Sequence, residues 1–272
     1  MLTLDIAGQR LEAEEGATLG EVFKRSYPQG FKEGVAARLN GRVVDFHTPI
    51  RDSGSLEFIS VDSPEGLAVL RHSTAHLMAS AVMNIFPEAK FAIGPSIDDG
   101  FYYDFEVSRP ISVEDLAAIE KRMLEIARED HRFIRGELNR DEAIDRFKRL
   151  DEKFKVEIIQ DLPDATVSTY THSFFTDLCR GPHVPKTKML RHFKLTSVAG
   201  AYWRGDSNRP MLQRIYGTAF PTQEALEQHL QRIEEAKLRD HRRLGTALDL
   251  YSVHEEAGGG LIFWHPHGAA IR

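Results

Sequence analysis

Two short histidine-containing pairs, far apart in the sequence, place the strongest constraint on how this chain folds. His72 and His76 are four residues apart in a segment with helical periodicity, so both imidazoles lie on one helix face about one turn apart. Cys179, the only cysteine, is followed four residues later by His183. If the pairs act together, the fold must bring them to one place. Three imidazoles and one thiol then form either a soft metal site or a cluster of proton donors and acceptors around a water.

The composition is that of an ordinary globular protein. Apolar residues make up 42% and charged residues 28% of the 272 residues, enough for about two domains. We expect no membrane span, because no run of about 20 apolar residues occurs. We also expect no signal peptide, because the N-terminus lacks a basic start followed by an apolar stretch. A single cysteine cannot form an internal disulfide, which favours a reducing, cytoplasmic setting.

The charge is unevenly distributed. The net charge of -6 argues against a generic nucleic-acid binder, but residues 186–243 carry 12 Lys and Arg against 6 Asp and Glu, which leaves +6 there and -12 elsewhere. A polyanion would meet a local basic face in this segment, and a solvated helix surface explains the pattern equally well.

The first 62 or so residues have the pattern of a small separate module. Apolar residues alternate in two short stretches within the first 13 residues, as in a pair of strands. Thr18 and Glu21 form a capping-box pattern for a helix that runs toward Tyr27. Asn40–Gly41 favours a type I′ turn between two further strands, and a last strand covers Leu56–Val61. This order predicts a small mixed sheet crossed by one helix, the β-grasp pattern.

A long helix is predicted after this module. Ser63 is a good N-cap and Pro64 suits the first helical position, so the helix runs from there to about Phe86. Its apolar stripe consists of Leu67, Leu70, Leu77, Ala81 and Ile85. His72 and His76 lie on a different, overlapping face, as wall residues of a cleft do.

The middle of the chain alternates between helix and strand signals. Residues 98–100 favour a hairpin turn with a returning strand at 101–105. Ser112 caps a helix through His131, and Asn139 caps another through Leu150. A strand is predicted over 166–172, and Gly181, Pro182 and Pro185 indicate a rigid loop at 179–185.

The last fifty residues read as a connection rather than a core. From Pro221 to about Leu244 the pattern is one long charged helix. The glycines at 258–260 break the chain. Leu261–Trp264 begins an apolar element, and the sequence ends eight residues after Trp264. We therefore expect a truncated final domain.

Several motifs together identify a resemblance. The residues that carry it are the two pairs above, Lys155 and three segments. The segments are Asp177-Leu178-Cys179-Arg180-Gly181-Pro182-His183, Ala199-Gly200-Ala201-Tyr202-Trp203-Arg204-Gly205-Asp206 and Gln213-Arg214-Ile215-Tyr216-Gly217-Thr218-Ala219-Phe220. Over its whole length the chain resembles the N-terminal half of bacterial threonyl-tRNA synthetases.

The resemblance implies an α+β protein in four parts. A TGS domain, a ubiquitin-like β-grasp module, covers residues 1–62, and a larger α+β editing domain covers 63–221. A linker helix and connection cover 222–257, and 258–272 look like the start of a class II catalytic domain. ATP, Mg and the zinc of the catalytic domain belong to the missing part, so we expect no aminoacylation by this chain.

The implied function is proofreading. Serine is threonine without a methyl group, and one methyl discriminates by only about 1 to 3 kcal/mol, so the parent ligase charges some tRNA(Thr) with serine. Hydrolysis of that ester needs an oriented water, a base near neutral pKa, and donors for the oxyanion and leaving hydroxyl.

The resemblance also implies roles for individual residues. His72 organises the water and contacts the terminal ribose. His76 and His183 hold the pocket together. Lys155 stabilises the leaving oxygen or fixes the water, although from sequence alone it reads as a surface lysine. Cys179 binds metal, acts as a nucleophile or does neither, and we rank the nucleophile last because an oriented water suffices for ester hydrolysis.

Four residues are implied in binding the amino acid. Asp177 matches a residue that reads the serine amino group, and Tyr103 matches a pocket tyrosine. Gly94 and Pro95 bring backbone close to the substrate and help to exclude the extra methyl of threonine.

On the long charged helix, Arg239, Arg242 and Arg243 are our candidates for tRNA contacts.

Ligand counting and the resemblance disagree about metal. Three imidazoles and one thiolate, from His72, His76, Cys179 and His183, match a tetrahedral zinc site. The resemblance implies a site that works through waters, and a lysine beside zinc pays like-charge repulsion. We therefore predict editing without a required cofactor, with zinc as the alternative.

Two other functional classes remain as alternatives. A zinc-dependent, alanyl-type trans-editing hydrolase uses the same His, His, Cys, His spacing. A non-catalytic regulator with a TGS module binds RNA or the ribosome, but such proteins carry an adjacent His-Asp dyad, and this sequence contains no His-Asp dipeptide. The expected partner is seryl-tRNA(Thr), with no membrane and no DNA. We expect a monomer here, with the parent dimerising through the missing half.

Overall fold

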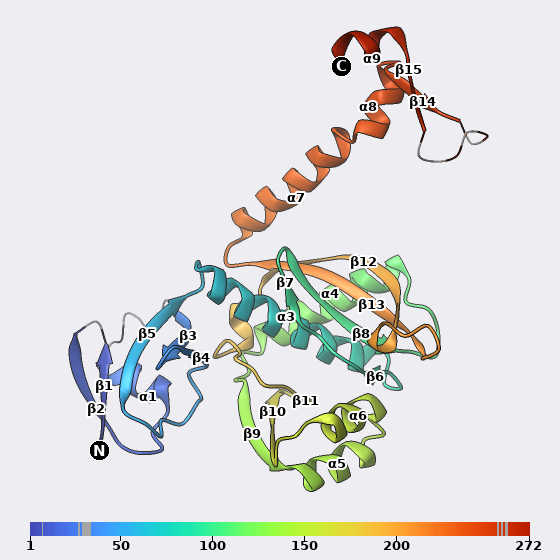
Figure 1. Cartoon of the computed structure of the whole chain (residues 1–272). Helices are drawn as coiled ribbons and strands as arrows, with labels where there is room; N and C mark the ends of the chain where they lie inside the picture. Colours follow the sequence, from blue (N-terminus) through green and yellow to red (C-terminus); the bar gives the residue numbers. More distant parts are fainter. Residues whose placement is uncertain (7, 27, 29–33, 255, 257, 259–260) are drawn as a thin grey trace. The chain divides into compact units, whose positions relative to one another are not determined.

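The computed structural model describes residues 1–6, 8–26, 28, 34–254, 256, 258 and 261–272 (Figure 1). The chain divides into two compact units, Met1–Thr222 and Gln223–Arg272. Several sheets and helices occur in separate runs, so the fold class is α+β. None of the described helices is long and apolar enough to cross a membrane.

The first sheet is built from the N-terminal residues. Its strands are β1 (Leu2–Ile6), β2 (Gln9–Ala13), β3 (Gly34–Leu39), β4 (Arg42–Val44) and β5 (Gly54–Ser60), in the order β2-β1-β5-β3-β4. β1 and β5 pair in parallel and the other neighbours pair antiparallel, so the sheet is mixed, as predicted. Helix α1 (Leu19–Ser26) packs its Leu19, Val22 and Phe23 into the core of this sheet.

Local sequence signals explain the ends of these elements. Thr18 and Glu21 each accept a hydrogen bond from the other's backbone N–H, so the predicted capping box is confirmed. Asn40 and Gly41 both have positive φ, 49° and 81°, which gives the tight hairpin between β3 and β4 that the sequence predicts. Tyr27, toward which the first helix was expected to run, lies outside the described residues.

The second sheet carries most of the core of the first unit. Its strands are β6 (Lys90–Phe91), β7 (Ser96–Ile97), β8 (Gly100–Glu106), β12 (His192–Tyr202) and β13 (Met211–Phe220). They lie in the order β12-β13-β8-β6, with β7 also paired to β8. Helices α3 (Pro64–Ile85) and α4 (Val113–Arg128) share one hydrophobic core with this sheet (Figure 1).

Helix α3 is more deeply buried than a simple amphipathic stripe predicts. Ser63 caps it by accepting from the Gly66 N–H, with Pro64 in the first turn, as expected. However, polar residues such as Ser73 and Thr74 are as fully buried as Leu77. Their hydroxyls donate to backbone carbonyls one turn earlier, which removes the cost of burying them.

The third sheet is smaller and carries its own helices. Strands β9 (Ile134–Asn139), β10 (Thr166–His172) and β11 (Phe175–Leu178) pair antiparallel in the order β11-β10-β9. Helices α5 (Arg140–Arg149) and α6 (Lys153–Asp161) pack on it through a separate apolar cluster. The caps at Ser112 and Asn139 and the strand over 166–172 are confirmed, whereas α6 was not predicted.

The second unit contains α7 (Gln223–Leu238), α8 (His241–Ala247), β14 (Tyr251–Val253), β15 (Ile262–Trp264) and α9 (Pro266–Ile271). The prediction of one helix to Leu244 is wrong, because α7 ends at Leu238. Asp240 then starts a new helix by accepting from the Arg242 N–H at 2.8 Å. Of the glycines at 258–260, Gly259 and Gly260 lie outside the described residues.

Candidate active site

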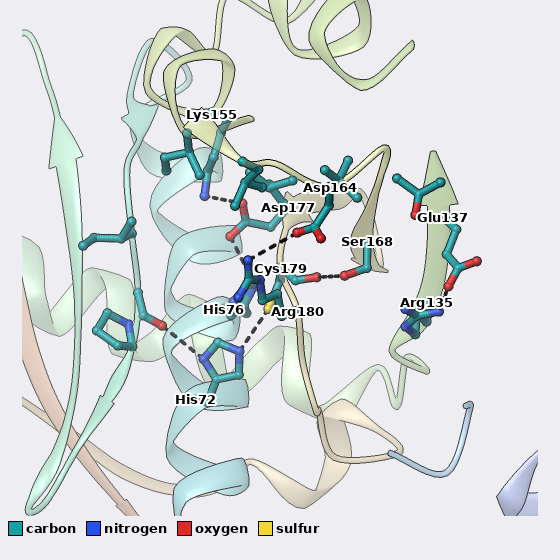
Figure 2. A pocket seen from close by; sticks show the side chains of 18 of the residues that line it. His72, His76, Arg135, Glu137, Lys155, Asp164, Ser168, Asp177, Cys179 and Arg180 are labelled. Carbon is teal, nitrogen blue, oxygen red and sulfur yellow. Dashed lines mark hydrogen bonds and ion pairs between the residues drawn. The ribbon is translucent and has the colours of Figure 1, made fainter. Parts of the chain in front are cut away.

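The two histidine-containing pairs meet, and Figure 2 shows three of the four side chains, those of His72, His76 and Cys179. His72 and His76 project from α3, and Cys179 and His183 come from the loop after β11. The His72 Nε2 lies 3.0 Å from the Cys179 Sγ, and the His183 Nε2 lies 3.3 Å from it. The backbone N–H of Gly181 donates to the same sulfur at 3.2 Å. The fold therefore gathers all four side chains around one thiol.

The outer nitrogens of two of these rings are held by neighbouring groups. The His72 Nδ1 lies 3.1 Å from the Gly94 carbonyl oxygen, which only accepts, so Nδ1 carries the proton and Nε2 presents a lone pair. The His183 Nδ1 lies 3.1 Å from the Ser73 hydroxyl. Phe133 stacks on the His183 ring with centroids 4.8 Å apart. These contacts fix the orientation of each imidazole.

A buried ionic network lies beside this cluster. The Lys155 Nζ forms an ion pair with Asp177 Oδ1, and both side chains are 3% exposed. Asp177 Oδ2 accepts from the Tyr103 hydroxyl at 2.6 Å and lies 3.3 Å from the His76 Nδ1. Lys155 also donates to the Tyr103 oxygen at 2.9 Å. Lys155 and Tyr103 thus donate to one carboxylate, with the His76 ring beside it, and the carboxylate holds the charge of Lys155 in place.

Burial keeps the cluster neutral. Loss of water lowers the pKa of His72 and lowers those of His76 and His183 further, with mutual repulsion between the imidazoles as a second cause. Burial also raises the pKa of the Cys179 thiol to about 12. At neutral pH the three imidazoles are free bases and the thiol is protonated. Neutral Cys179 is a poor nucleophile.

A cavity of about 920 Å³ opens above these groups. His72, His76, Lys155, Asp177 and Cys179 line it, so the ionic network and the thiol cluster face one common space (Figure 2). Gly94 and Pro95 also line this cavity. A neutral imidazole, a cation and a carboxylate around one cavity can orient a water and bind an amine.

Two of the residues named from the sequence are buried beneath the cavity. Tyr103 was expected to line the amino-acid pocket, but it is fully buried below the cavity and acts on it only through Asp177 and Lys155. His183 is also fully buried, behind Cys179. Both sit in the aromatic core beneath the site, where Tyr103 stacks on Phe105.

Gly94 has a reason for being glycine that the sequence did not reveal. A Cβ at this position would lie 2.1 Å from the Tyr103 ring. The residue therefore lets Tyr103 pack under the site, and its carbonyl sets the protonation of His72.

Several residues at the site were missed by sequence reasoning. Glu152 directly precedes α6, and its carboxylate accepts from the Phe91 N–H at 3.0 Å instead of capping the helix. Burial raises its pKa to about 7. Arg42, Arg135 and Arg180 line the cavity at its outer end. Arg42 comes from the first sheet, so no pattern near the histidines points to it.

The three basic candidates in the second unit are partly neutralised. Arg239 pairs with Glu235 at 3.2 Å and Arg242 pairs with Asp240 at 2.8 Å. Arg243 is exposed on α8, and no ion pair of it occurs within the described part of the chain. The free positive charge on this segment is smaller than the sequence count suggests.

The His72, His76, Cys179 and His183 group fits a zinc ion in donor type and number. Their donor atoms all lie within 4.8 Å of one another. The outer nitrogens of His72 and His183 meet Gly94 and Ser73, the kind of support that metal-bound histidines have. Lys155 is paired with Asp177, which reduces the like-charge repulsion expected from the sequence.

Comparisons with known proteins show which sequences this chain is similar to. A family profile described as "Threonyl and Alanyl tRNA synthetase second additional domain" matches residues 167–216. The chain is 54% identical over 271 residues to a threonine–tRNA ligase of Maridesulfovibrio salexigens, covering 99% of this chain and 42% of that protein. It is 52% identical to a threonine–tRNA ligase of Nitratidesulfovibrio vulgaris strain DP4, covering 100% of this chain and 42% of that protein. It is also 52% identical to a threonine–tRNA ligase of Rubrobacter xylanophilus, covering 97% of this chain and 41% of that protein.

The chain belongs to the threonyl-tRNA synthetase family. It corresponds to the N-terminal part of these relatives and spans about 42% of the length of the first two. Within this synthetase-family chain, the matched profile covers Asp177, Cys179 and His183, together with β12 and most of β13. His72, Tyr103 and Lys155 lie outside the matched range.

Proposed function

We propose that this chain hydrolyses the ester bond of seryl-tRNA(Thr), as the proofreading part of a threonine–tRNA ligase. The observation that carries the proposal is the convergence of His72, Lys155, Asp177 and Cys179 on one cavity. The family membership and the matched profile support the same function. Serine and threonine differ by one methyl group, so a second site is needed to remove serine.

The proposal assigns four parts to the chain. Residues 1–62 form a TGS domain, supported by the mixed sheet with helix α1 packed on it. Residues 63–221 form the editing domain, which contains the second and third sheets. Residues 222–257 form the linker, and 258–272 begin a class II catalytic domain. ATP-dependent charging then belongs to the remainder of the ligase.

In the proposed mechanism, water attacks the ester carbonyl carbon and the ribose hydroxyl leaves. Burial lowers the pKa of His72 and Gly94 fixes its tautomer, so Nε2 carries a lone pair, which lies 3.0 Å from the Cys179 thiol. In the proposed mechanism the attacking water replaces the thiol as the partner of Nε2, which orients the water and takes its proton. The Lys155 ammonium stabilises negative charge on the tetrahedral intermediate and the leaving oxygen. The proton that His72 took from the water passes to the departing ribose oxygen, so that the imidazole is neutral again when the products separate.

The carboxylate of Asp177 is placed to receive the amino group of the seryl ester. It lines the cavity and already accepts from Lys155 and Tyr103, so its oxygens are fixed in direction. Gly94 and Pro95 provide the close wall that excludes the methyl group of threonine. His76, His183 and Cys179 hold this arrangement together, with the thiol neutral.

A zinc-dependent variant of the same hydrolysis is the second candidate. The four donors within 4.8 Å favour it. His72, His76, Cys179 and His183 would hold the ion, and zinc supplies Lewis acidity and a more acidic bound water. Measuring the zinc content of protein purified without chelator, and activity after chelation and zinc return, separates the two candidates. Stoichiometric zinc with activity that depends on it would replace the metal-free proposal.

The proposal is tested with two substrates that differ by one methyl group. The purified chain is incubated with seryl-tRNA(Thr) and with threonyl-tRNA(Thr), without ATP, and release of the amino acid is measured. We expect rapid release of serine and slow release of threonine. Equal rates, or rates no faster than in buffer alone, would contradict the proposal.

A further inference from the structure

A second cavity continues from the active-site cavity. It has a volume of about 520 Å³ and is lined by the β3–β4 hairpin region of the first sheet and by the loop after Cys179. The two cavities share only four of the residues that line them: Arg42, Arg135, Glu137 and Arg180. Three guanidinium groups and one carboxylate therefore mark the boundary between the cavities.

The three arginines come from separate parts of the fold. Arg42 begins β4, directly after the Asn40–Gly41 turn of the first sheet. Arg135 lies on β9, and Arg180 follows Cys179 in the loop that completes the active site. Figure 2 shows Arg135 beside Glu137 on β9, away from Lys155, whereas Arg180 lies in the middle of the view, overlapping Cys179.

Two of the three guanidinium groups are weakly engaged, and the third has donors to spare. Arg180 lies 3.6 Å from Asp164, with the two side chains 77% and 58% exposed. Such an exposed, long ion pair contributes almost nothing and is readily exchanged. Arg42 is exposed, and no ion pair of it occurs among the described residues. Arg135 is held by Glu137 at 2.6 Å and keeps donors beyond that single contact.

Positive charge is concentrated at the boundary. The remaining charged residues around the active-site cavity are Lys155, Asp164 and Asp177. Those around the second cavity are Arg51, Asp45 and Asp52. Away from the boundary, each cavity is therefore lined by one more acidic than basic side chain. At the boundary itself, basic side chains outnumber acidic ones by two. Away from Lys155, which the proposed reaction uses, this junction is where the lining residues most favour an anionic group.

We propose that Arg42, Arg135 and Arg180 bind a phosphodiester of single-stranded RNA. The phosphate is the one that joins the terminal nucleoside, seated in the active-site cavity, to the preceding nucleotide in the second cavity. Forked guanidinium donors suit phosphate oxygens. The first sheet, through Arg42 and the hairpin that lines the second cavity, thereby contributes to substrate binding. This inference rests on the proposed function for the identity of the terminal nucleoside.

The test compares substrates with and without the phosphate. Seryl-adenosine lacks it, and the trinucleotide CCA esterified with serine at its 3′ end contains it. For Arg42→Ala and Arg180→Ala, we expect the ratio of kcat/KM on the trinucleotide to kcat/KM on seryl-adenosine to fall about tenfold. Arg10→Ala is the matched control, because Arg10 lies on β2, at the opposite edge of the same sheet from Arg42. Its ratio stays at the wild-type value.

Binding is measured independently of hydrolysis with 5′-labelled, uncharged CCA. Each arginine variant weakens binding, and the slope of log affinity against log salt falls by about 0.7 for each lost phosphate contact. Unchanged CCA affinity and salt slope in Arg42→Ala and Arg180→Ala would overturn the phosphodiester site. If the wild type binds CCA through these arginines but hydrolyses neither ester, the proposed function fails and the binding site stands.

Discussion

The buried ionic network and the arginine boundary differ in how exposed their charged side chains are and in how firmly those side chains are paired. Lys155 and Asp177 are 3% exposed and fully committed to each other, to Tyr103 and to His76. Arg180, at the other end of the same cavity, is 77% exposed with one loose partner. Buried charges have fixed directions and are costly to disturb, whereas exposed guanidiniums adapt to a flexible ligand. The first region suits chemistry and the second suits binding.

The largest expected effect is on the chemical step. His72→Ala removes an imidazole that lines the cavity together with Lys155. Its Nδ1 donates to the Gly94 carbonyl oxygen, which leaves the lone pair on Nε2. We expect hydrolysis of seryl-tRNA(Thr) to fall about a thousandfold, the usual range for a lost general base. His267→Ala, at an exposed position in the second unit, is the matched control and retains activity.

The fold of His72→Ala is checked by its thermal unfolding. A folded variant with wild-type activity would show that the imidazole is a wall of the cavity and not the base. That result would remove the distinction between the buried cluster and the arginine boundary.

Breaking the buried ion pair comes next. Lys155→Ala leaves the buried Asp177 carboxylate without its cationic partner and with the Tyr103 hydroxyl as a donor, so we expect the free energy of unfolding to fall by about 3 kcal/mol. Denaturant titration measures this. Lys121→Ala, an exposed lysine on α4, changes stability by less than about 0.5 kcal/mol.

Adding Asp177→Asn to Lys155→Ala sharpens the result. If the pair is coupled, the double variant loses less stability than the two single variants together. Additive losses would mean that Lys155 behaves like an exposed residue and that its burial has no energetic consequence.

The elements that the sequence predicted well are those with local causes. The Asn40–Gly41 turn and the caps at Ser63, Ser112 and Asn139 depend on one or two side chains bonding nearby backbone. The resemblance supplied the set of residues that meet in the cavity, and the structure brings His72, Lys155 and Asp177 to it.

Burial and long-range contacts were beyond the reach of local patterns. Lys155 reads as a surface lysine because nothing in Phe154–Glu157 shows that α6 packs it against Asp177 and Tyr103. Arg42 lies in a different sheet, more than a hundred residues from Cys179, so only the fold brings it to the cavity. The break at Asp240 was missed because a capping aspartate resembles any other charged residue in a charged helix.

A smaller effect concerns pH and a buried histidine away from the cavity. Burial lowers the pKa of His172 to about 3, and its Nε2 has no hydrogen-bond partner in the described part of the chain. A lowered pKa means that the unfolded chain binds a proton first as pH falls below about 6.5. The stability is therefore complete above that pH and declines below it.

Replacing His172 by Phe removes this contribution. We expect the slope of unfolding free energy against pH, between about pH 6 and 4, to fall by about 1.4 kcal/mol per pH unit. His267→Phe leaves the slope unchanged, since that side chain is exposed. Equal slopes in wild type and His172→Phe would show that His172 is already protonated in the folded state.

The smallest expected effect lies in the second unit. Arg243 carries the least compensated charge of the three basic candidates, so Arg243→Glu weakens tRNA binding more than Arg239→Glu or Arg242→Glu. We expect changes of less than about tenfold, because surface charges are screened by salt. Affinity measured at two salt concentrations checks this. Unchanged affinity in all three variants would identify this basic segment as a solvated surface.

The comparison between chemistry and binding is tested most directly by single-turnover hydrolysis of seryl-tRNA(Thr) at increasing enzyme concentration. For His72→Ala we predict a limiting rate about a thousandfold below wild type with an unchanged half-saturating concentration. For Arg42→Ala we predict the wild-type limiting rate, reached only at about tenfold higher enzyme concentration. A lower limiting rate for Arg42→Ala, together with a raised half-saturating concentration for His72→Ala, would contradict the account.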